Sequence, residues 1–151
     1  MKSRYHVAAS IIVSAGTYVL SDSATMAAVT LFSGIFIDAD HLIDYVFMHR
    51  PPYNIGRFFE TYYKNKPTHV FLVLHSWDLI LILVPMAMAT NGDPFITGLL
   101  IGMGHHLLLD QIFNHAYPLG YFLTFRIFFR LSYARCFRLP SCTTNNEKNF
   151  D

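Results

Sequence analysis

The sequence has few charged residues. Asp, Glu, Lys and Arg make up 14% of its 151 residues, whereas hydrophobic residues make up 53% and the mean hydropathy is +0.34. Soluble domains are charged at about a quarter of their positions. The composition therefore argues against a soluble protein and favours a membrane protein, and the length leaves room for one domain.

Several common catalytic motifs are also absent. The two cysteines, Cys136 and Cys142, form neither a disulfide framework nor a convincing zinc ribbon. The sequence contains no glycine-rich phosphate-binding loop, no nucleophile elbow and no Cys-x-x-Cys pair, which argues against nucleotide, serine-hydrolase and thiol redox chemistry. The formal net charge of +1 says nothing about partners, but the basic residues are placed as membrane topology signals are, so no nucleic-acid partner is expected.

Four apolar stretches are present instead, and most are near the roughly 20 residues that a bilayer crossing requires. They comprise residues 6–20, 24–48, 68–90 and 95–115. Residues 119–139 mix aromatics with arginines, which is typical of a helix lying in the membrane interface. We predict an all-α fold: an up-and-down four-helix transmembrane bundle within residues 1–140, with an additional C-terminal interfacial helix. Residues 141–151 are expected to be a polar, disordered tail.

The first stretch also resembles a signal peptide. Lys2 and Arg4 precede it, and Ser21-Asp22-Ser23-Ala24 follows it. Asp22 is atypical of a cleavage site and another apolar run follows almost at once, so we favour a retained helix. Cleavage would remove His6.

The basic residues suggest the orientation in the membrane. All eleven Lys and Arg residues lie before the first stretch, between the second and third, or after the fourth. By the positive-inside rule, this pattern predicts an integral protein of the cytoplasmic (inner) membrane with both termini in the cytoplasm.

The same topology brings His and Asp residues of all four stretches to the cytoplasmic side of the bundle. They are His6, Asp38, Asp40, His75, His106 and Asp110. His106 and Asp110 are four residues apart and share a helix face. We expect His75 to lie about two turns into the third helix, where Asp78 would orient its imidazole. Helical bundles build metal sites in this way, and a His/Asp set suits zinc, manganese or iron.

The order of these residues resembles the YdjM-like family of inner-membrane-associated metal-dependent hydrolases. The resemblance rests on the early His6, Asp38-x-Asp40-His41, His75-Ser76, Gly102-x-x-x-His106-x-x-x-Asp110 and Phe137-Arg138-Leu139-Pro140. That family is distantly similar to zinc-dependent phospholipases C and single-strand nucleases. The resemblance implies one or two divalent ions, zinc first, with Asp110 as the bridging ligand. The family's upstream His-Arg-Gly is missing here, because the chain reads Lys66-Pro67-Thr68-His69, and its loss would alter or abolish activity.

The sequence thus predicts a membrane-bound metal-dependent hydrolase that acts on a phosphoester or a lipid-type ester through a metal-activated water. The expected catalytic residues are Asp38, Asp40, His75 and Asp110, with Asp38 as a general base. The expected partners are the lipid bilayer and a lipid or lipid-linked substrate. Two alternatives stay open: a non-catalytic membrane protein with a structural metal or polar cluster, and an ion or proton conductor.

Overall fold

The computed structural model describes residues 3–48, 51–60, 69–114 and 117–137, and these residues are mostly helical. The helices are α1 (Ser3–Ser21), α2 (Ala24–Phe36), α3 (Ala39–Met48), α4 (Ile55–Glu60), α5 (Trp77–Ala89), α6 (Pro94–Phe113), the 3-10 helix η2 (Pro118–Tyr121), α7 (Leu123–Phe128) and α8 (Tyr133–Phe137). The described residues contain no strand, only an isolated bridge between His69 and Ser132. The predicted all-α fold is confirmed.

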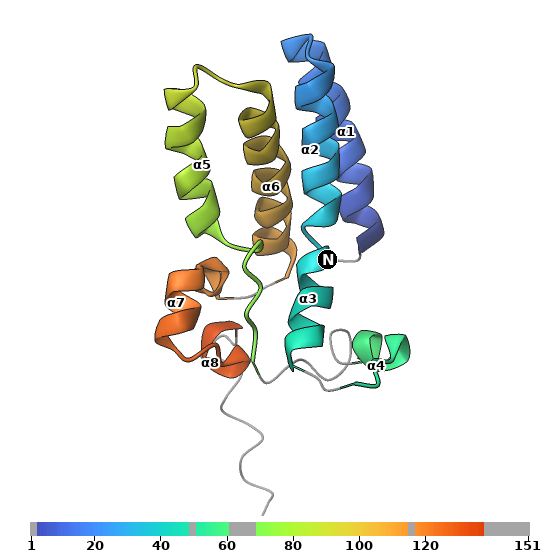
Figure 1. Ribbon diagram of the computed structural model, residues 1–151, viewed down its shortest axis with the longest axis vertical. Helices are drawn as coiled ribbons and strands as arrows, with labels where there is room; N and C mark the ends of the chain where they lie inside the picture. Colours follow the sequence, from blue (N-terminus) through green and yellow to red (C-terminus); the bar gives the residue numbers. More distant parts are fainter. Residues whose placement is uncertain (1–2, 49–50, 61–68, 115–116, 138–151) are drawn as a thin grey trace, which may run out of the picture.

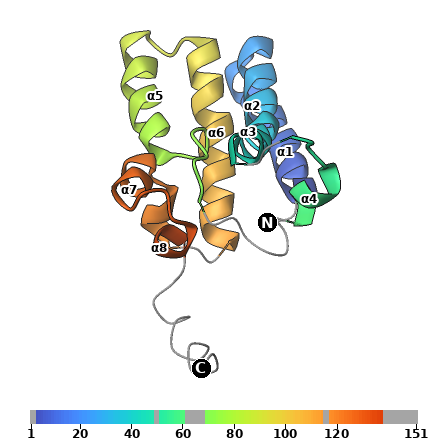
Figure 2. The ribbon, with the colours of Figure 1, turned by 60° about the horizontal axis from the view of Figure 1, so that its bottom comes forward.

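Helices α1, α2, α5 and α6 run side by side as two antiparallel hairpins (Figure 1). The α1–α2 and α5–α6 turns lie together at one end, and α3, α4, α7 and α8 lie at the other. Helix α6 is central, because it packs against α2, α5 and α1. Figure 2 shows α7 and α8 on one side of the C-terminal half of α6 and α4 on the other, near the start of α1.

Side-chain caps set where the bundle helices begin. The Ser23 hydroxyl accepts the Met26 amide at the start of α2, and the Asp93 carboxylate accepts the amides of Phe95 and Ile96 at the start of α6. Pro94 occupies the first turn of α6, where its missing N–H has no intrahelical role. The two hairpin turns expected from the sequence are therefore in place.

Helices α2 and α6 approach closely because glycines line the contact. A Cβ at Gly98 would lie 2.8 Å from the Met26 carbonyl oxygen, and a Cβ at Gly102 would lie 2.5 Å from the Thr30 carbonyl oxygen. No larger residue fits at either position without moving a helix. Small residues of this kind permit close helix packing in membranes.

Residues 24–48 differ from the single helix expected, because Ile37 and Asp38 form a turn between α2 and α3. The Asp38 amide donates to the Ile35 carbonyl at 3.4 Å instead of continuing the α-helical pattern. Asp38 therefore lies in a turn at the end of α2 and not inside a helix.

The prediction of a helix over residues 68–90 is wrong for its first part. Residues 69–76 form no helix, and α5 begins only after Ser76, whose hydroxyl accepts the Asp78 amide. His75 therefore lies on an irregular segment and not two turns into a helix. Residues 119–139 also differ from the single interfacial helix expected, because the described part divides into η2, α7 and α8.

Two helical stretches are long and apolar enough to cross a membrane, by length and composition: Ala24–Phe47 and Pro94–Phe113. Helix α5 is apolar but has only 13 residues. Large apolar side chains at the turn end of the bundle are exposed, among them Val19 (81%), Leu20 (90%) and Met88 (75%). The predicted tail of residues 141–151 lies outside the described residues.

Candidate metal centre

Five His and Asp side chains that are far apart in the sequence meet near the end of α2. They are His6 of α1, Asp38 of the turn between α2 and α3, His75 of the segment before α5, and His106 and Asp110 of α6. Four of the five residues are buried, and Asp38 is the exception, with its side chain 32% exposed. All five were predicted from the sequence as metal ligands.

The spacing of four ligand atoms suits a divalent ion. Asp38 Oδ1 lies 3.6 Å from His75 Nε2 and 3.4 Å from His106 Nε2, and Asp110 Oδ2 lies 3.8 and 3.7 Å from the same two nitrogens. His and Asp bind zinc at about 2.0–2.2 Å, so neighbouring ligand atoms of a tetrahedral site are about 3.4 Å apart. Both Nε2 atoms are buried and have no hydrogen-bond partner. Buried polar atoms usually have a partner, and a metal ion could be the partner here.

His106 is oriented by its second ring nitrogen. Its Nδ1 lies 2.7 Å from the Gly34 carbonyl oxygen, so Nδ1 carries the proton and donates it, leaving Nε2 as the free ligand. The Gly34 carbonyl is available because the Asp38 amide donates to Ile35, three residues back. The end of α2 thus places Asp38 and also fixes the tautomer of His106.

Asp110 is held through the carboxylate oxygen that faces away from His75 and His106. Its Oδ1 lies 3.0 Å from His6 Nε2 and accepts a 2.8 Å hydrogen bond from Asn114 Nδ2. The Tyr121 hydroxyl donates to the Asp110 carbonyl at 3.2 Å. Burial raises the pKa of Tyr121, so this donor stays protonated. These contacts leave Oδ2 directed at the candidate ion.

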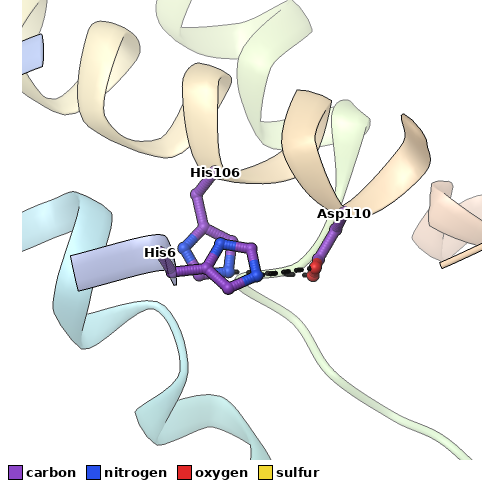
Figure 3. Close-up of side chains that lie close together, drawn as sticks. All are labelled: His6, His106 and Asp110. Atoms are coloured by element: carbon purple, nitrogen blue, oxygen red, sulfur yellow. Dashed lines mark ion pairs between the residues drawn. The ribbon is translucent and has the colours of Figure 1, made fainter. Parts of the chain in front are cut away.

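His6 is better placed to hold Asp110 than to bind the same ion. His6, His106 and Asp110 lie close enough to form a metal-binding group of their own (Figure 3). However, the rings of His6 and His106 are stacked at 4.0 Å and inclined by only 17°. One ion cannot lie on the lone-pair axes of two nearly parallel stacked rings. We therefore assign His6 to its contact with Asp110.

The Asp40 carboxylate accepts hydrogen bonds from backbone amides of the segment that contains His75. Its Oδ2 accepts the amides of Leu74 at 2.6 Å and His75 at 3.2 Å, and it lies 3.5 Å from His75 Nδ1. One turn later, Asp44 Oδ1 accepts the Phe71 amide at 3.0 Å. The structure therefore places Asp40 as the carboxylate that orients His75, a role that the sequence analysis gave to Asp78.

Asp78 instead joins the start of α5 to the C-terminal helices. Its carboxylate accepts hydrogen bonds from the hydroxyls of Ser76 and Thr124 and from the Leu123 amide. His41 is nearer the site, with its ring 4.8 Å from that of His75.

The charge of His75 depends on its carboxylate neighbours. Burial alone lowers the pKa of its imidazole, but the interactions with Asp38 and Asp40 and the charge of Asp110 outweigh burial and raise the pKa to about 9. A divalent ion would replace this proton, because a ligating imidazole must be neutral.

The residues that contact the candidate ligands from outside the set were not predicted from the sequence. They are Gly34, Asn114, Tyr121 and Arg126, whose guanidinium donates to the His75 carbonyl at 3.0 Å. Only Asn114 carried a readable signal, since it lies four residues after Asp110 and caps the C-terminus of α6. The contacts of Gly34 and Arg126 join segments that are distant in the chain, and no local pattern reveals them.

No protein-family model matches the chain, and no curated protein or solved structure is detectably similar to it. The fold and the site define the protein by class. It is an all-α protein with two helical stretches capable of spanning a membrane and a buried His/Asp cluster able to hold a metal ion.

Proposed function

We propose that the protein is a membrane-bound metal-dependent hydrolase whose centre contains His75, His106 and Asp110, with zinc as the first candidate and manganese or iron as alternatives. The observation that carries the proposal is the convergence of two buried imidazole Nε2 atoms, neither with a hydrogen-bond partner, and two carboxylate oxygens that each lie 3.4–3.8 Å from both nitrogens. Structural zinc sites usually contain cysteine, whereas sets of two histidines and a carboxylate are typical of catalytic zinc. Membership of the YdjM-like family is part of this proposal.

Asp38 is the member of the cluster that a substrate would meet. Its side chain is 32% exposed, whereas those of His75, His106 and Asp110 are exposed by 2%, 0% and 8%. In the mechanism we propose, a divalent ion held by His75, His106 and Asp110 would supply a bound water of lowered pKa. Asp38 would accept a proton from that water as the water oxygen attacks the ester, and it would return this proton to the alcohol oxygen as the ester bond breaks.

The surroundings of Asp38 favour a substrate with an apolar part. Phe36, Leu42 and Ile43 flank it in sequence, and their side chains are 60%, 55% and 48% exposed. The residues 24–47 that contain Asp38 also form one of the two stretches apolar enough to span a membrane. A lipid or lipid-linked phosphoester or carboxylic ester would meet the site at this surface without leaving the bilayer.

Metal content tests the proposal most directly. Elemental analysis of the detergent-purified protein is expected to find one equivalent of a transition metal in the wild type. Both Asp110→Ala and His106→Ala should lose the metal. His105→Ala is the matched control, because His105 neighbours His106 but hydrogen-bonds Ser10 at 3.1 Å outside the ligand set. A wild type that stays metal-free after incubation with zinc and with manganese would rule out the hydrolase.

A structural metal is the second candidate function, and the position of Asp38 Oδ1 as the fourth ligand atom favours it. Direct ligation by Asp38 would complete a closed tetrahedron with no place for water. The variant Asp38→Asn separates the two functions. The hydrolase predicts that this variant keeps its metal and loses turnover of phosphoester and lipid substrates. The structural site predicts that the metal affinity falls while no substrate is hydrolysed even by the wild type.

A further inference from the structure

Arg126 of α7 is buried inside the protein. It is 0% exposed, and among the described residues no other Lys or Arg is buried. Its place in the arginine-bearing stretch 119–139 predicts an interfacial side chain, and the nearby Arg130 is indeed exposed. A buried guanidinium is expensive unless it has a specific partner.

That partner is the backbone of a proposed metal ligand. Arg126 Nη2 donates to the His75 carbonyl at 3.0 Å, while the His75 amide donates to Asp40 Oδ2 at 3.2 Å. The His75 carbonyl is therefore bound by the guanidinium of Arg126 from α7, and the His75 amide is bound by the carboxylate of Asp40 from α3. Because residues 69–76 form no helix, no helical hydrogen bonds fix the backbone there.

The charge of Arg126 also suits its surroundings. Asp40 and Asp44 are buried, and both accept hydrogen bonds from segment 69–76. A divalent ion beside Asp38 and Asp110 would balance the charges of those two carboxylates and leave the charges of Asp40 and Asp44 to be balanced by other groups. Arg126 Nε and Nη1 are buried and have no hydrogen-bond partner. Apart from its one hydrogen bond to His75, the guanidinium therefore acts through its positive charge, which attracts the nearby carboxylates.

We propose that Arg126 is a positioning residue of the metal centre, which holds the His75 carbonyl so that the His75 imidazole meets the ion. The inference rests on the metal site proposed above. It assigns to the C-terminal helices a function in metal binding, although they supply no ligand. The contact between the Val70 amide and the Leu131 carbonyl, at 2.8 Å, attaches the other end of the same segment to this C-terminal part.

The test compares Arg126→Met and Arg126→Lys with the control Arg130→Met in the full-length protein in detergent. Zinc affinity is measured by competition with a chromophoric chelator, and coordination by the visible spectrum of the cobalt-loaded protein. Arg126→Met is expected to weaken zinc binding by about 10- to 100-fold, the usual effect of removing a group that orients a ligand. It should also change the cobalt spectrum, whereas Arg126→Lys should recover part of the affinity and Arg130→Met should match the wild type.

A purely structural role for Arg126 would give a different result. Arg126→Met would then lower the melting temperature of the metal-free protein but leave the zinc affinity and cobalt spectrum of the folded fraction unchanged, and this would overturn the inference. If Arg126→Met does not fold, Arg126→Gln replaces it with the same two outcomes. A wild type that binds neither zinc nor cobalt would instead refute the proposed metal site itself.

Discussion

Asn114 shows how one residue outside the ligand set affects a ligand. Its amide donates to Asp110 Oδ1 at 2.8 Å and to the Tyr121 hydroxyl at 3.1 Å, so it joins α6 to η2 at the site. Asn114→Ala would leave Asp110 free to rotate and is expected to weaken metal binding by about tenfold. Gln111→Ala is the control, because Gln111 lies on the same helix but bonds Trp77. Equal zinc affinities for the two variants, measured by chelator competition, would contradict this role of Asn114.

The proton on His75 predicts how the metal-free protein responds to pH. Its folded-state pKa of about 9 is raised above the ordinary value of 6.5. The stability from its carboxylate partners is therefore fully present below about pH 6.5 and is lost as pH rises through about 9. Chelator-treated protein should melt at progressively lower temperature between these pH values, and His75→Gln should show a smaller decline. The same decline in both proteins would show that His75 is not the group responsible.

At the scale of single residues, the sequence predicted which His and Asp side chains lie close together. His6, Asp38, His75, His106 and Asp110 were identified because His and Asp are rare in apolar sequence, and the fold brings them together. Which of these residues would bind an ion and which would orient a ligand could not be predicted. Whether Asp40 binds a metal or holds a backbone amide depends on where residues 69–76 pass, and hydropathy does not encode that path.

At the scale of helices, hydropathy predicted the long helices of the bundle but not the turn at residues 37–38 or the irregular segment 69–76. Helices α1, α2 and α6 begin close to the expected positions, because polar turns and caps interrupt the apolar pattern there. Segment 69–76 is largely apolar, yet it is irregular because Asp40, Asp44 and Arg126 bind its backbone groups. Such long-range competition for the backbone leaves no periodic signal in the sequence.

Ser76 is the residue that ends this irregular segment and starts α5. Its hydroxyl accepts the Asp78 amide at 3.2 Å and also the Leu123 amide at 2.9 Å. Ser76→Ala should therefore destabilise the protein by more than the roughly 1 kcal/mol expected for loss of a cap alone. Ser23→Ala, which removes only the cap of α2, is the comparison. Thermal unfolding in detergent measures both variants, and an equal loss in both would exclude a contribution from the contact with Leu123.

The hydroxyl residues between α1, α2 and α6 bear on the ion-conductor alternative. Ser14 donates to the Ala27 carbonyl at 2.8 Å, and Thr30 donates to the Gly98 carbonyl at 3.3 Å. Ser33 donates within α2 to the Val29 carbonyl at 2.7 Å and also contacts the Gly98 carbonyl of α6 at 3.5 Å. Hydroxyls committed to carbonyls act as packing contacts between helices. These contacts favour a closed bundle over a relay of protons.

At the scale of the whole molecule, the two ends of the bundle differ in kind. The end with the α1–α2 and α5–α6 turns exposes apolar side chains such as Leu20 and Met88. The opposite end carries the His/Asp cluster, the start of α1 with Arg4, and the C-terminal part of the described chain with the exposed Arg130 and Arg135. For a bundle that spans a membrane, the positive-inside rule predicts that this second end faces the cytoplasm.

The topology can be tested with cysteines placed at the two ends, in a chain whose native cysteines are replaced by alanine. Thr90→Cys lies at the exposed end of α5, beside the α5–α6 turn, and Ala134→Cys lies at an exposed position of α8. A membrane-impermeant maleimide added to intact cells should label Thr90→Cys, and it should label Ala134→Cys only after the membrane is opened. This result would place the His/Asp cluster at the cytoplasmic surface, which is the side on which the proposed hydrolase would meet its substrate. Labelling of both cysteines in intact cells, or of neither until the membrane is opened, would contradict a bundle that spans the bilayer and would separate the metal site from the membrane assignment.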